Sequence, residues 1–196
     1  MIKNFSLFLL KILGWRVRAE EIRHKKFIII GAPHTSNWDF PLSLLALSAL
    51  GMNFSWIGKH TLFKPPFNSF FRYLGGIPVD RNVRLSFIED MARLVNQTDD
   101  MKLAIAPEGT RSKKNHWKTG FYYIALAAKV PIVLAYIDYS KRELGIGPTL
   151  IPTGNLEMDF DIIFNFYQGK TGKYLHKQSD IRIRKRELQR IKKKQP

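Results

Sequence analysis

Short apolar runs of strand length recur along the chain and alternate with segments in which apolar residues follow a helical period. The strand-like runs occupy residues 27–30, 53–58, 77–79, 102–106 and 130–137. The helix-like segments occupy residues 42–47, 83–96 and 120–129. Uninterrupted apolar runs are typical of strands buried on both faces, as in parallel sheets covered by helices. The pattern therefore predicts a single α/β domain with a mixed, mostly parallel sheet flanked by helices.

The pattern changes after Asp138, where glycine and proline become frequent. Five such residues interrupt the apolar pattern: Gly145, Gly147, Pro148, Pro152 and Gly154. They separate short β-like segments, which indicates a hairpin that adds antiparallel strands. Residues 155–166 then have helical spacing, and the chain from Gly169 onward is polar and basic. We expect one domain at 21–180, preceded by a segment at 1–20 and followed by a tail at 181–196.

The first residues form an amphipathic pattern when they are plotted at about 100° per residue. Lys3, Asn4, Lys11 and Gly14 fall in one stripe, which Leu7 interrupts. The opposite side consists of apolar residues: Ile2, Phe5, Phe8, Leu9, Ile12 and Leu13. Such a helix can lie in a membrane interface, or it can pack against the core of its own protein. A signal peptide is the rival interpretation, but no small-residue cleavage site follows.

Charge and composition narrow the classes of partner and chemistry. The chain has 196 residues and a formal net charge of +16, and it contains no cysteine, which excludes disulfides, thiolate metal sites and a cysteine nucleophile. Between residues 181 and 194, eight basic residues face a single acid. The partner should therefore be anionic: a nucleic acid, an acidic carrier protein or an anionic membrane. A solvated basic tail without a specific partner is equally open. No apolar stretch reaches the roughly 18 residues that crossing a bilayer requires.

Two polar segments follow strand-like runs and stand out as candidate chemistry. The first, residues 31–39, contains His34 and Asp39 directly after the run at 27–30. The second, residues 107–112, follows the apolar run at 103–106. Function in α/β sheets concentrates at the carboxyl ends of strands, so we expect the two segments to form one site.

The spacing of His34 and Asp39 restricts how they can meet. Residues five apart on a straight helix point about 140° away from each other. The two side chains can meet if His34 lies in a turn and Asp39 in the first turn of a helix. Ser36 and Asn37 are suitable N-caps, and Pro41 is tolerated so early in a helix. The alternative is a surface histidine beside an N-capping aspartate.

Four segments together resemble the motifs of the glycerolipid acyltransferases, most closely the lysophosphatidate (1-acylglycerol-3-phosphate) acyltransferase superfamily. They are His34-x4-Asp39, the stretch from Lys59 through Pro66 to Arg81, Pro107–Ser112 and Val130–Val133. The resemblance covers roughly residues 27 to 138, so the segment at 21–180 is expected to be an acyltransferase domain. It departs from the family at Pro33, where asparagine is frequent, and at Leu134, where a second proline is common. The longer amino-terminal membrane anchor of many members is reduced here to the short amphipathic segment.

The resemblance implies transfer of an acyl chain from a thioester of coenzyme A or acyl-carrier protein to a glycerolipid hydroxyl, without a metal or a cofactor. An attacking alcohol needs a base, and a histidine is suited to that role near neutral pH. Asp39 would fix the tautomer of His34 and stabilise the imidazolium. Because the acceptor supplies its own hydroxyl, no serine nucleophile is needed. The thiolate that leaves has a pKa of about 8.5 by analogy with cysteine, so a general acid is dispensable.

A phosphorylated acceptor would need cations and a close backbone approach. Lys59, Arg81 and Arg111 are the expected phosphate ligands, with Arg111 offering a planar fork. In the same loop as Arg111, Gly109 lets the backbone approach a ligand, Thr110 is a further candidate contact, and Glu108 could orient the arginine or a substrate hydroxyl. The alternatives are an internal ion pair between Glu108 and Arg111, and a salt bridge from Arg81 to Asp80 or Glu89.

The acyl chain would need apolar walls. Aromatic candidates lie beside the first polar segment: Phe63, Phe67, Phe70, Phe71 and Tyr73. Their helical spacing also suits ordinary core packing.

The sequence thus predicts an enzyme that acylates lysophosphatidate to phosphatidic acid in phospholipid biosynthesis. Another lysolipid or glycerol 3-phosphate is the alternative acceptor, and a non-enzymatic basic protein that binds membrane or nucleic acid is the alternative class. Nucleic acid is not expected, because the aromatic residues cluster beside the first polar segment and not in the basic tail. The predicted location is peripheral, on the cytoplasmic face of an anionic membrane.

Overall fold

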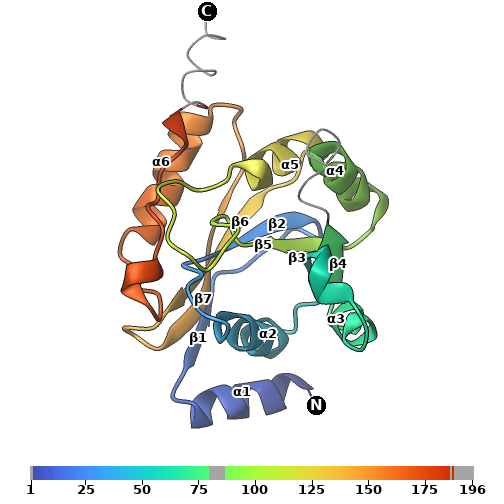
Figure 1. Ribbon diagram of the computed structural model, residues 1–196, viewed down its shortest axis with the longest axis vertical. Coiled ribbons are helices and arrows are strands. Elements are labelled where there is room, and N and C mark those ends of the chain that lie inside the picture. Colours follow the sequence, from blue (N-terminus) through green and yellow to red (C-terminus); the bar gives the residue numbers. More distant parts are fainter. Residues whose placement is uncertain (1, 80–86, 186, 188–196) are drawn as a thin grey trace, which may run out of the picture.

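The computed structural model describes residues 2–79, 87–185 and 187, and these form one α/β domain (Figure 1). Their seven-stranded sheet has the order β1-β7-β6-β2-β5-β3-β4. The strands are β1 Arg16–Ala19, β2 Phe27–Ala32, β3 Ser55–Lys59, β4 Gly76–Val79, β5 Lys102–Ile105, β6 Ile132–Asp138 and β7 Glu143–Leu150. All neighbouring strands are parallel except β6 and β7, which are antiparallel. The predicted mostly parallel sheet is confirmed.

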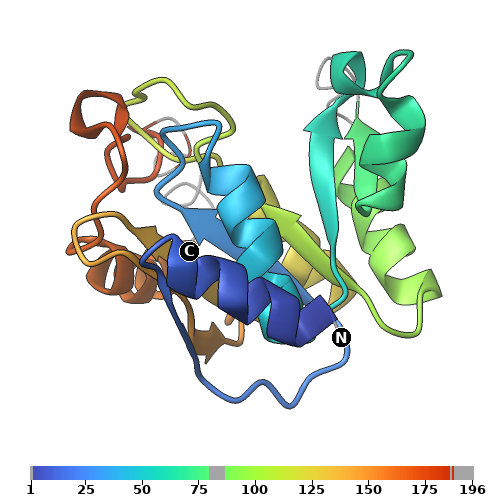
Figure 2. The same cartoon turned by 90° about the horizontal axis from the view of Figure 1, so that it is seen from below.

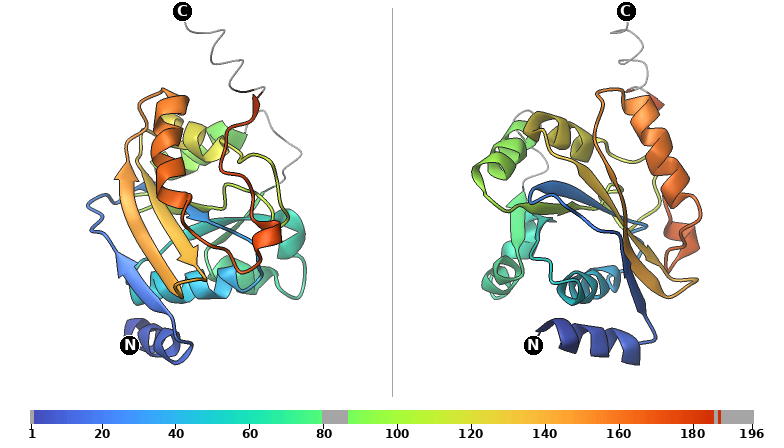
Figure 3. Two further views of the ribbon diagram at one scale, coloured as in Figure 1. Left: turned by 90° about the vertical axis from the view of Figure 1, so that its left-hand side faces the viewer. Right: turned by 180° about the vertical axis from the view of Figure 1, so that it is seen from behind.

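Helices cover both faces of the sheet, as Figure 3 shows. The described helices are α1 Ile2–Ile12, α2 Asp39–Ala49, α3 Asn68–Tyr73, α4 Phe87–Gln97, α5 Gly120–Ala128 and α6 Leu156–Tyr167. Short 3-10 turns occupy His60–Phe63 and Leu175–Lys177. On one face of the sheet, buried residues of β2 pack with residues of α4, α5 and α6. On the other face, buried residues of β2 pack with a residue of α2. This double cover explains the continuous apolar runs in the sequence.

Strand β2 lies at the centre of the sheet, between β5 and β6. Its alternate side chains enter opposite cores: Ile28 and Ile30 pack toward α5 and α6, whereas Phe27 and Ile29 pack toward α2. Ile30 pairs in register with Ile105 of β5 and with Leu134 of β6. Since these three strands are parallel, the loops that follow them emerge at the same edge of the sheet, where we expect the site.

Two elements differ from the sequence-based expectation. The glycine-rich region at 143–150 is one strand, β7, and not several short segments. A Cβ at Gly145 would lie 2.5 Å from the ring of Tyr136, and one at Gly147 would lie 2.3 Å from the ring of Phe166. These glycines therefore admit aromatic packing against the strand and do not interrupt it. Strand β1 was not predicted; it pairs with β7 at the edge of the sheet and has mostly exposed residues.

The amino-terminal helix α1 lies across α2 on the outer side of the molecule (Figure 2). Its buried residues are Ser6 and Leu10, which face the protein. The apolar residues on its other sides remain exposed: Ile2, Phe5, Leu7, Phe8 and Ile12. Packing against the fold thus uses a narrow stripe of α1 and leaves most of its apolar surface uncovered. None of the helices in the described part of the chain is long and apolar enough to cross a membrane.

Candidate active site

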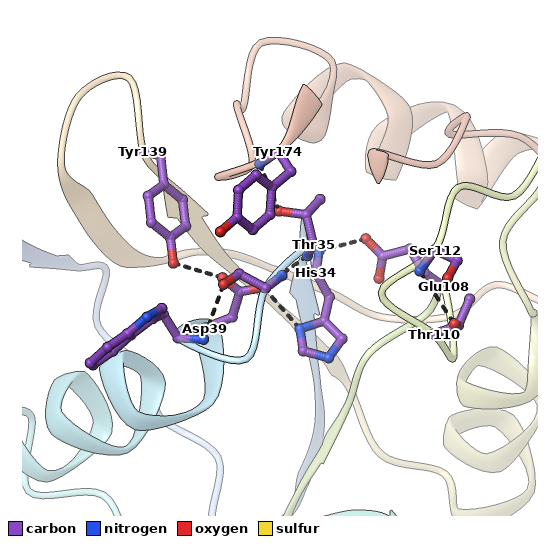
Figure 4. Close-up of polar contacts among 10 residues, drawn as sticks. His34, Thr35, Asp39, Glu108, Thr110, Ser112, Tyr139 and Tyr174 are labelled. Carbon is purple, nitrogen blue, oxygen red and sulfur yellow. Dashed lines mark hydrogen bonds and ion pairs between the residues drawn. The ribbon is translucent and has the colours of Figure 1, made fainter. Parts of the chain in front are cut away.

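His34 and Asp39 meet where the loop after β2 enters α2. Asp39 is the first residue of the helix, and Nδ1 of His34 lies 3.0 Å from Oδ2 of Asp39 (Figure 4). The predicted N-caps are wrong, because the cap residue is Trp38 and no side chain caps the helix. Instead the Ser36 hydroxyl accepts a hydrogen bond from the Trp38 amide, 3.2 Å away. The turn that joins strand to helix is therefore what brings imidazole and carboxylate together.

The carboxylate of Asp39 is buried and closely held. Its Oδ2 accepts the backbone N–H groups of Thr35 and Ser36, each at 2.8 Å, and its Oδ1 accepts the Tyr139 hydroxyl at 2.8 Å. Burial raises the pKa of Asp39, but the hydrogen bonds from His34, Ser36 and Tyr139 outweigh burial, so the net pKa is lowered. An ionised carboxylate only accepts hydrogen bonds, so His34 carries its proton on Nδ1. Its Nε2 keeps a lone pair that can accept a proton.

Glu108 lies behind His34. Its carboxylate is 2% exposed, and its Oε1 accepts the His34 backbone N–H at 2.9 Å (Figure 4). Its other oxygen, Oε2, is buried and has no hydrogen-bond partner among the described residues. Burial raises the pKa of Glu108 to about 7. The ion pair with Arg111, which the sequence analysis held open as the alternative, does not form within the described residues, and Glu108 contacts the loop of His34 instead. No local sequence pattern predicts this contact between Glu108 and the backbone of His34.

The rest of the second polar segment surrounds the opening of the site. Gly109 has φ +64°, and a Cβ there would lie 2.9 Å from Nζ of Lys118, so the turn requires glycine. The Thr110 hydroxyl accepts the Ser112 backbone N–H at 3.3 Å. Arg111 forms no ion pair within the described residues and is exposed at the surface of the cavity described below.

A cavity of about 1180 Å³ joins these groups. Its polar lining includes His34, Asp39, Gly109, Thr110 and several cations: Lys59, Arg111, Lys118 and Arg184. Its apolar lining comes from α2, β3 and α5 and from the sheet between them. Lys59, at the end of β3, and Arg111 thus line the same cavity as His34. The sequence analysis expected these three residues to belong to one site. Arg81 and Asp80 lie outside the described residues.

Of the five aromatic candidates after β3, one lines the cavity. Phe71 lines it, together with Trp56, which was not among the candidates. Phe63 is buried and stacks on Trp56, with ring centroids 5.8 Å apart. Phe67, Phe70 and Tyr73 are exposed. Phe63 therefore belongs to the packed interior, whereas Phe71 is part of the cavity wall.

The sequence analysis did not identify two parts of the site, Tyr139 and the loop at 168–178. Tyr139 directly follows β6, so its position at a strand end was a usable signal. The loop at 168–178 passes beside the catalytic turn, where the Tyr174 N–H donates to the Thr35 hydroxyl at 3.3 Å. In the same loop, Nζ of Lys173 lies 5.5 Å from the ring centroid of Trp38. No local pattern in the sequence predicts such a long-range contact.

Comparisons with known proteins identify the family of this chain. A family model described as Acyltransferase matches residues 15–138, more than half of the chain. The 1-acyl-sn-glycerol-3-phosphate acyltransferases of Salmonella typhimurium (strain LT2) and Escherichia coli (strain K12) are 30% identical over 93 residues. That match covers 45% of this chain and 38% of each relative, so it spans well under half of their length.

The fold also has a solved counterpart. The crystal structure of the 1-acyl-sn-glycerophosphate (LPA) acyltransferase PlsC from Thermotoga maritima matches with a TM-score of 0.61 and 20% sequence identity. The match covers 86% of this chain and 77% of that one, and at this identity it supports the fold alone. The family model spans the His34–Asp39 turn, the Glu108–Arg111 loop and Tyr139's strand up to residue 138. By sequence pattern, fold and family match together, this chain belongs to the acyltransferase family.

Proposed function

We propose that this protein transfers an acyl chain from an acyl thioester to the hydroxyl of lysophosphatidate and so forms phosphatidic acid. The observation that carries the proposal is the His34–Asp39 pair in a cavity with both cationic and apolar walls. The cavity, at about 1180 Å³, is larger than a typical small-molecule site of roughly 300–1,000 Å³. It therefore has room for an acyl chain as well as a polar headgroup. The names of the two curated relatives support the choice of acceptor.

The reaction follows from the protonation state of His34. Its Nε2 accepts the proton of the acceptor hydroxyl while the oxygen forms a bond to the thioester carbonyl carbon. The carbon–sulfur bond then breaks, and the sulfur leaves as a thiolate that takes up a proton. His34 is an imidazolium from the time its Nε2 takes the hydroxyl proton until it gives that proton up. Asp39, held in its ionised form, stabilises this imidazolium. The chemistry needs no acyl-enzyme and no cofactor beyond the thioester itself.

The cations of the cavity provide the contact for the phosphate. Arg111 offers a planar fork that matches two phosphate oxygens, and Lys59 adds a second positive charge. Glu108 cannot serve as a substrate ligand in this arrangement, because it is buried behind His34. We therefore assign phosphate binding to Lys59 and Arg111, with Gly109 and Thr110 shaping the loop between them.

A lipid acceptor requires a membrane surface, and two surfaces of the protein suit one. The exposed apolar residues of α1 can enter a membrane interface. The loop at 168–178 exposes Leu175, and its exposed Lys173 lies over the ring of Trp38. This mixture of apolar, aromatic and basic groups is typical of membrane interfaces. We propose peripheral attachment to an anionic membrane on its cytoplasmic face. The sequence also indicates the basic tail at 181–196 as a membrane-binding segment, and most of that tail lies outside the described residues.

The experiment that tests the function measures thiol release from acyl-coenzyme A and from acyl-carrier protein, with the lipid product identified by mass spectrometry. The acceptor arms are lysophosphatidate, glycerol 3-phosphate, lysophosphatidylcholine and 1-acylglycerol, which lacks the phosphate. Phosphatidic acid formed with lysophosphatidate, and little product from 1-acylglycerol, is the expected result. Thiol release that does not depend on any acceptor would instead identify a thioesterase. Preference for another acceptor would overturn the assignment of lysophosphatidate.

A further inference from the structure

The side chain of Tyr139 reaches the oxygen of Asp39 that faces away from His34. The Tyr139 hydroxyl donates to Oδ1 of Asp39 at 2.8 Å, whereas His34, Thr35 and Ser36 all bind Oδ2 (Figure 4). Each carboxylate oxygen is therefore held from its own side. Within the described residues, Tyr139 is the one hydrogen-bond donor on Oδ1, and without it that oxygen would be buried and unpaired.

Tyr139 is itself fixed by segments that are distant in sequence. The ring of Trp15, between α1 and β1, packs edge-on against the Tyr139 ring at a centroid distance of 4.9 Å and an interplanar angle of 90°. The Tyr139 backbone N–H donates to the carbonyl of Thr171 at 2.8 Å. A side chain held at ring and backbone can present its hydroxyl in one place, which is what an orienting group requires.

The hydroxyl acts as a neutral donor. Burial and the hydrogen bond to Asp39 raise the pKa of Tyr139 far above its ordinary value, so the phenol keeps its proton. Donation to a carboxylate spreads part of the negative charge of Asp39 onto a second partner. The proton that His34 shares with Asp39 is then bound less tightly than it would be by a carboxylate without that donor.

We propose that Tyr139 is a positioning residue of the acyl-transfer site, which orients the Asp39 carboxylate and limits how strongly that carboxylate favours the protonated form of His34. The rate effect rests on the proposed function, but the effect on His34 does not. Tyr139 lies outside the four motif segments that resemble the family, and its role follows from its contacts alone.

The first test is an NMR titration of the His34 ring in the substrate-free protein. Tyr139→Phe removes one oxygen and keeps the ring against Trp15. We expect the titration midpoint of His34 to rise by about half a pH unit or more, a roughly threefold gain in proton affinity. This readout is independent of catalysis, so it would stand even if the proposed acceptor were wrong.

The matched control is Tyr122→Phe. The Tyr122 hydroxyl donates to Asp159 at 2.7 Å in a second buried tyrosine–aspartate pair, and neither residue lines the cavity. This variant should leave the midpoint of His34 unchanged. Other ionisable groups around the His34–Asp39 pair are Glu108 and Tyr174 and those on the cavity wall: Lys59, Arg111, His116, Lys118, Tyr123, Tyr136, Arg184 and Glu187. All of them are the same in the three proteins, so the comparison isolates one hydroxyl.

The kinetic test separates positioning from substrate binding. With Tyr139→Phe we expect kcat to fall by about tenfold, because small displacements of a catalytic group are costly, while KM for donor and acceptor stays within about twofold. The acid limb of the pH–rate profile should move upward together with the NMR midpoint. A loss of folded protein would lower the apparent kcat but would not move that limb.

One further variant covers the case in which Tyr139→Phe fails to fold. Trp15→Leu keeps the hydroxyl and loosens the ring that carries it, so it should shift the His34 midpoint in the same direction by a smaller amount. An unchanged or lowered midpoint in a folded Tyr139→Phe protein would overturn the proposal. If the Tyr139→Phe protein is not folded, an unchanged titration midpoint of His34 in Trp15→Leu would overturn the proposal.

Discussion

At the scale of single residues, His34 has a geometry that one substitution can test. Its Nδ1 is bonded to Asp39 and its ring is 27% exposed to the cavity, so His34→Ala removes the base with little effect on the core. We expect the rate of acyl transfer to fall by about 10²–10⁴-fold, the usual contribution of a positioned base. The assay is thiol release with lysophosphatidate, with thermal unfolding as the folding control. A variant that keeps more than about a tenth of the rate would exclude His34 as the base.

Glu108 makes a pH-dependent prediction about stability. Burial raises its pKa from the ordinary 4.5 to about 7, so the folded protein binds this proton more tightly than the unfolded chain does. The protonated carboxyl contributes stability below about 4.5, and this contribution is lost as the pH rises through about 7. Glu108→Gln keeps an oxygen that can accept the His34 N–H but does not titrate. Relative to wild type, it should gain on the order of 2–3 kcal/mol of unfolding free energy between about pH 4.5 and 8.

Urea unfolding of both proteins across that pH range measures the difference directly. Glu89→Gln, in α4 on the surface, is the matched control for loss of a carboxylate and should show no such trend. A Glu108→Gln difference that stayed constant with pH would mean that folding leaves the pKa of Glu108 at its ordinary value, so that Glu108 is ionised in the folded protein over most of this range. The buried contact would then have to be explained as a permanent charge behind His34.

At the scale of elements, sequence and structure agree where burial on both faces leaves a clear signal. Strand β2 was predicted because its first four residues are all apolar, and they pack alternately into two cores. Strand β1 was missed because it is a short edge strand whose arginines are exposed, and its pairing with β7 joins residues far apart in sequence. The meeting of His34 and Asp39 could be anticipated from turn geometry. The contacts of Tyr139 and of the loop at 168–178 could not, since they depend on the packing of distant segments.

Helix α1 allows a test of the membrane-facing surface. Phe5 and Phe8 are 60% and 59% exposed, so replacing both with serine removes apolar surface without opening the core. We expect the double variant to sediment less with anionic vesicles, because less apolar area enters the interface. Met158→Ser with Ile162→Ser, at 64% and 48% exposure on α6, is the matched control and should sediment like wild type. Equal loss in both variants would assign the effect to general surface polarity and not to α1.

At the scale of the whole molecule, the net charge of +16 predicts how membrane binding depends on salt. Electrostatic attraction to an anionic surface weakens as the Debye length shortens, whereas burial of apolar side chains does not. Sedimentation with anionic vesicles should therefore fall as salt rises and level off at a residual value set by α1. Neutral vesicles should show that residual value at all salt concentrations. If the protein bound neutral vesicles as strongly as anionic ones, electrostatic attraction would not contribute to membrane binding.

The short connection between α1 and β1 has a consequence for how the enzyme meets its substrate. Three residues separate Ile12 from Arg16, so the two Cα atoms can be at most about 14 Å apart, and β1 is hydrogen-bonded into the sheet. The β1 end of the helix is therefore held near the edge of the sheet, and packing against α2 holds the rest of α1 on the domain. A lipid surface that binds α1 fixes the tilt of the whole domain above the bilayer. On the proposed membrane attachment, the opening of the cavity would keep a constant height and angle above the lipid, and the proposed lipid acceptor would reach it by lateral diffusion.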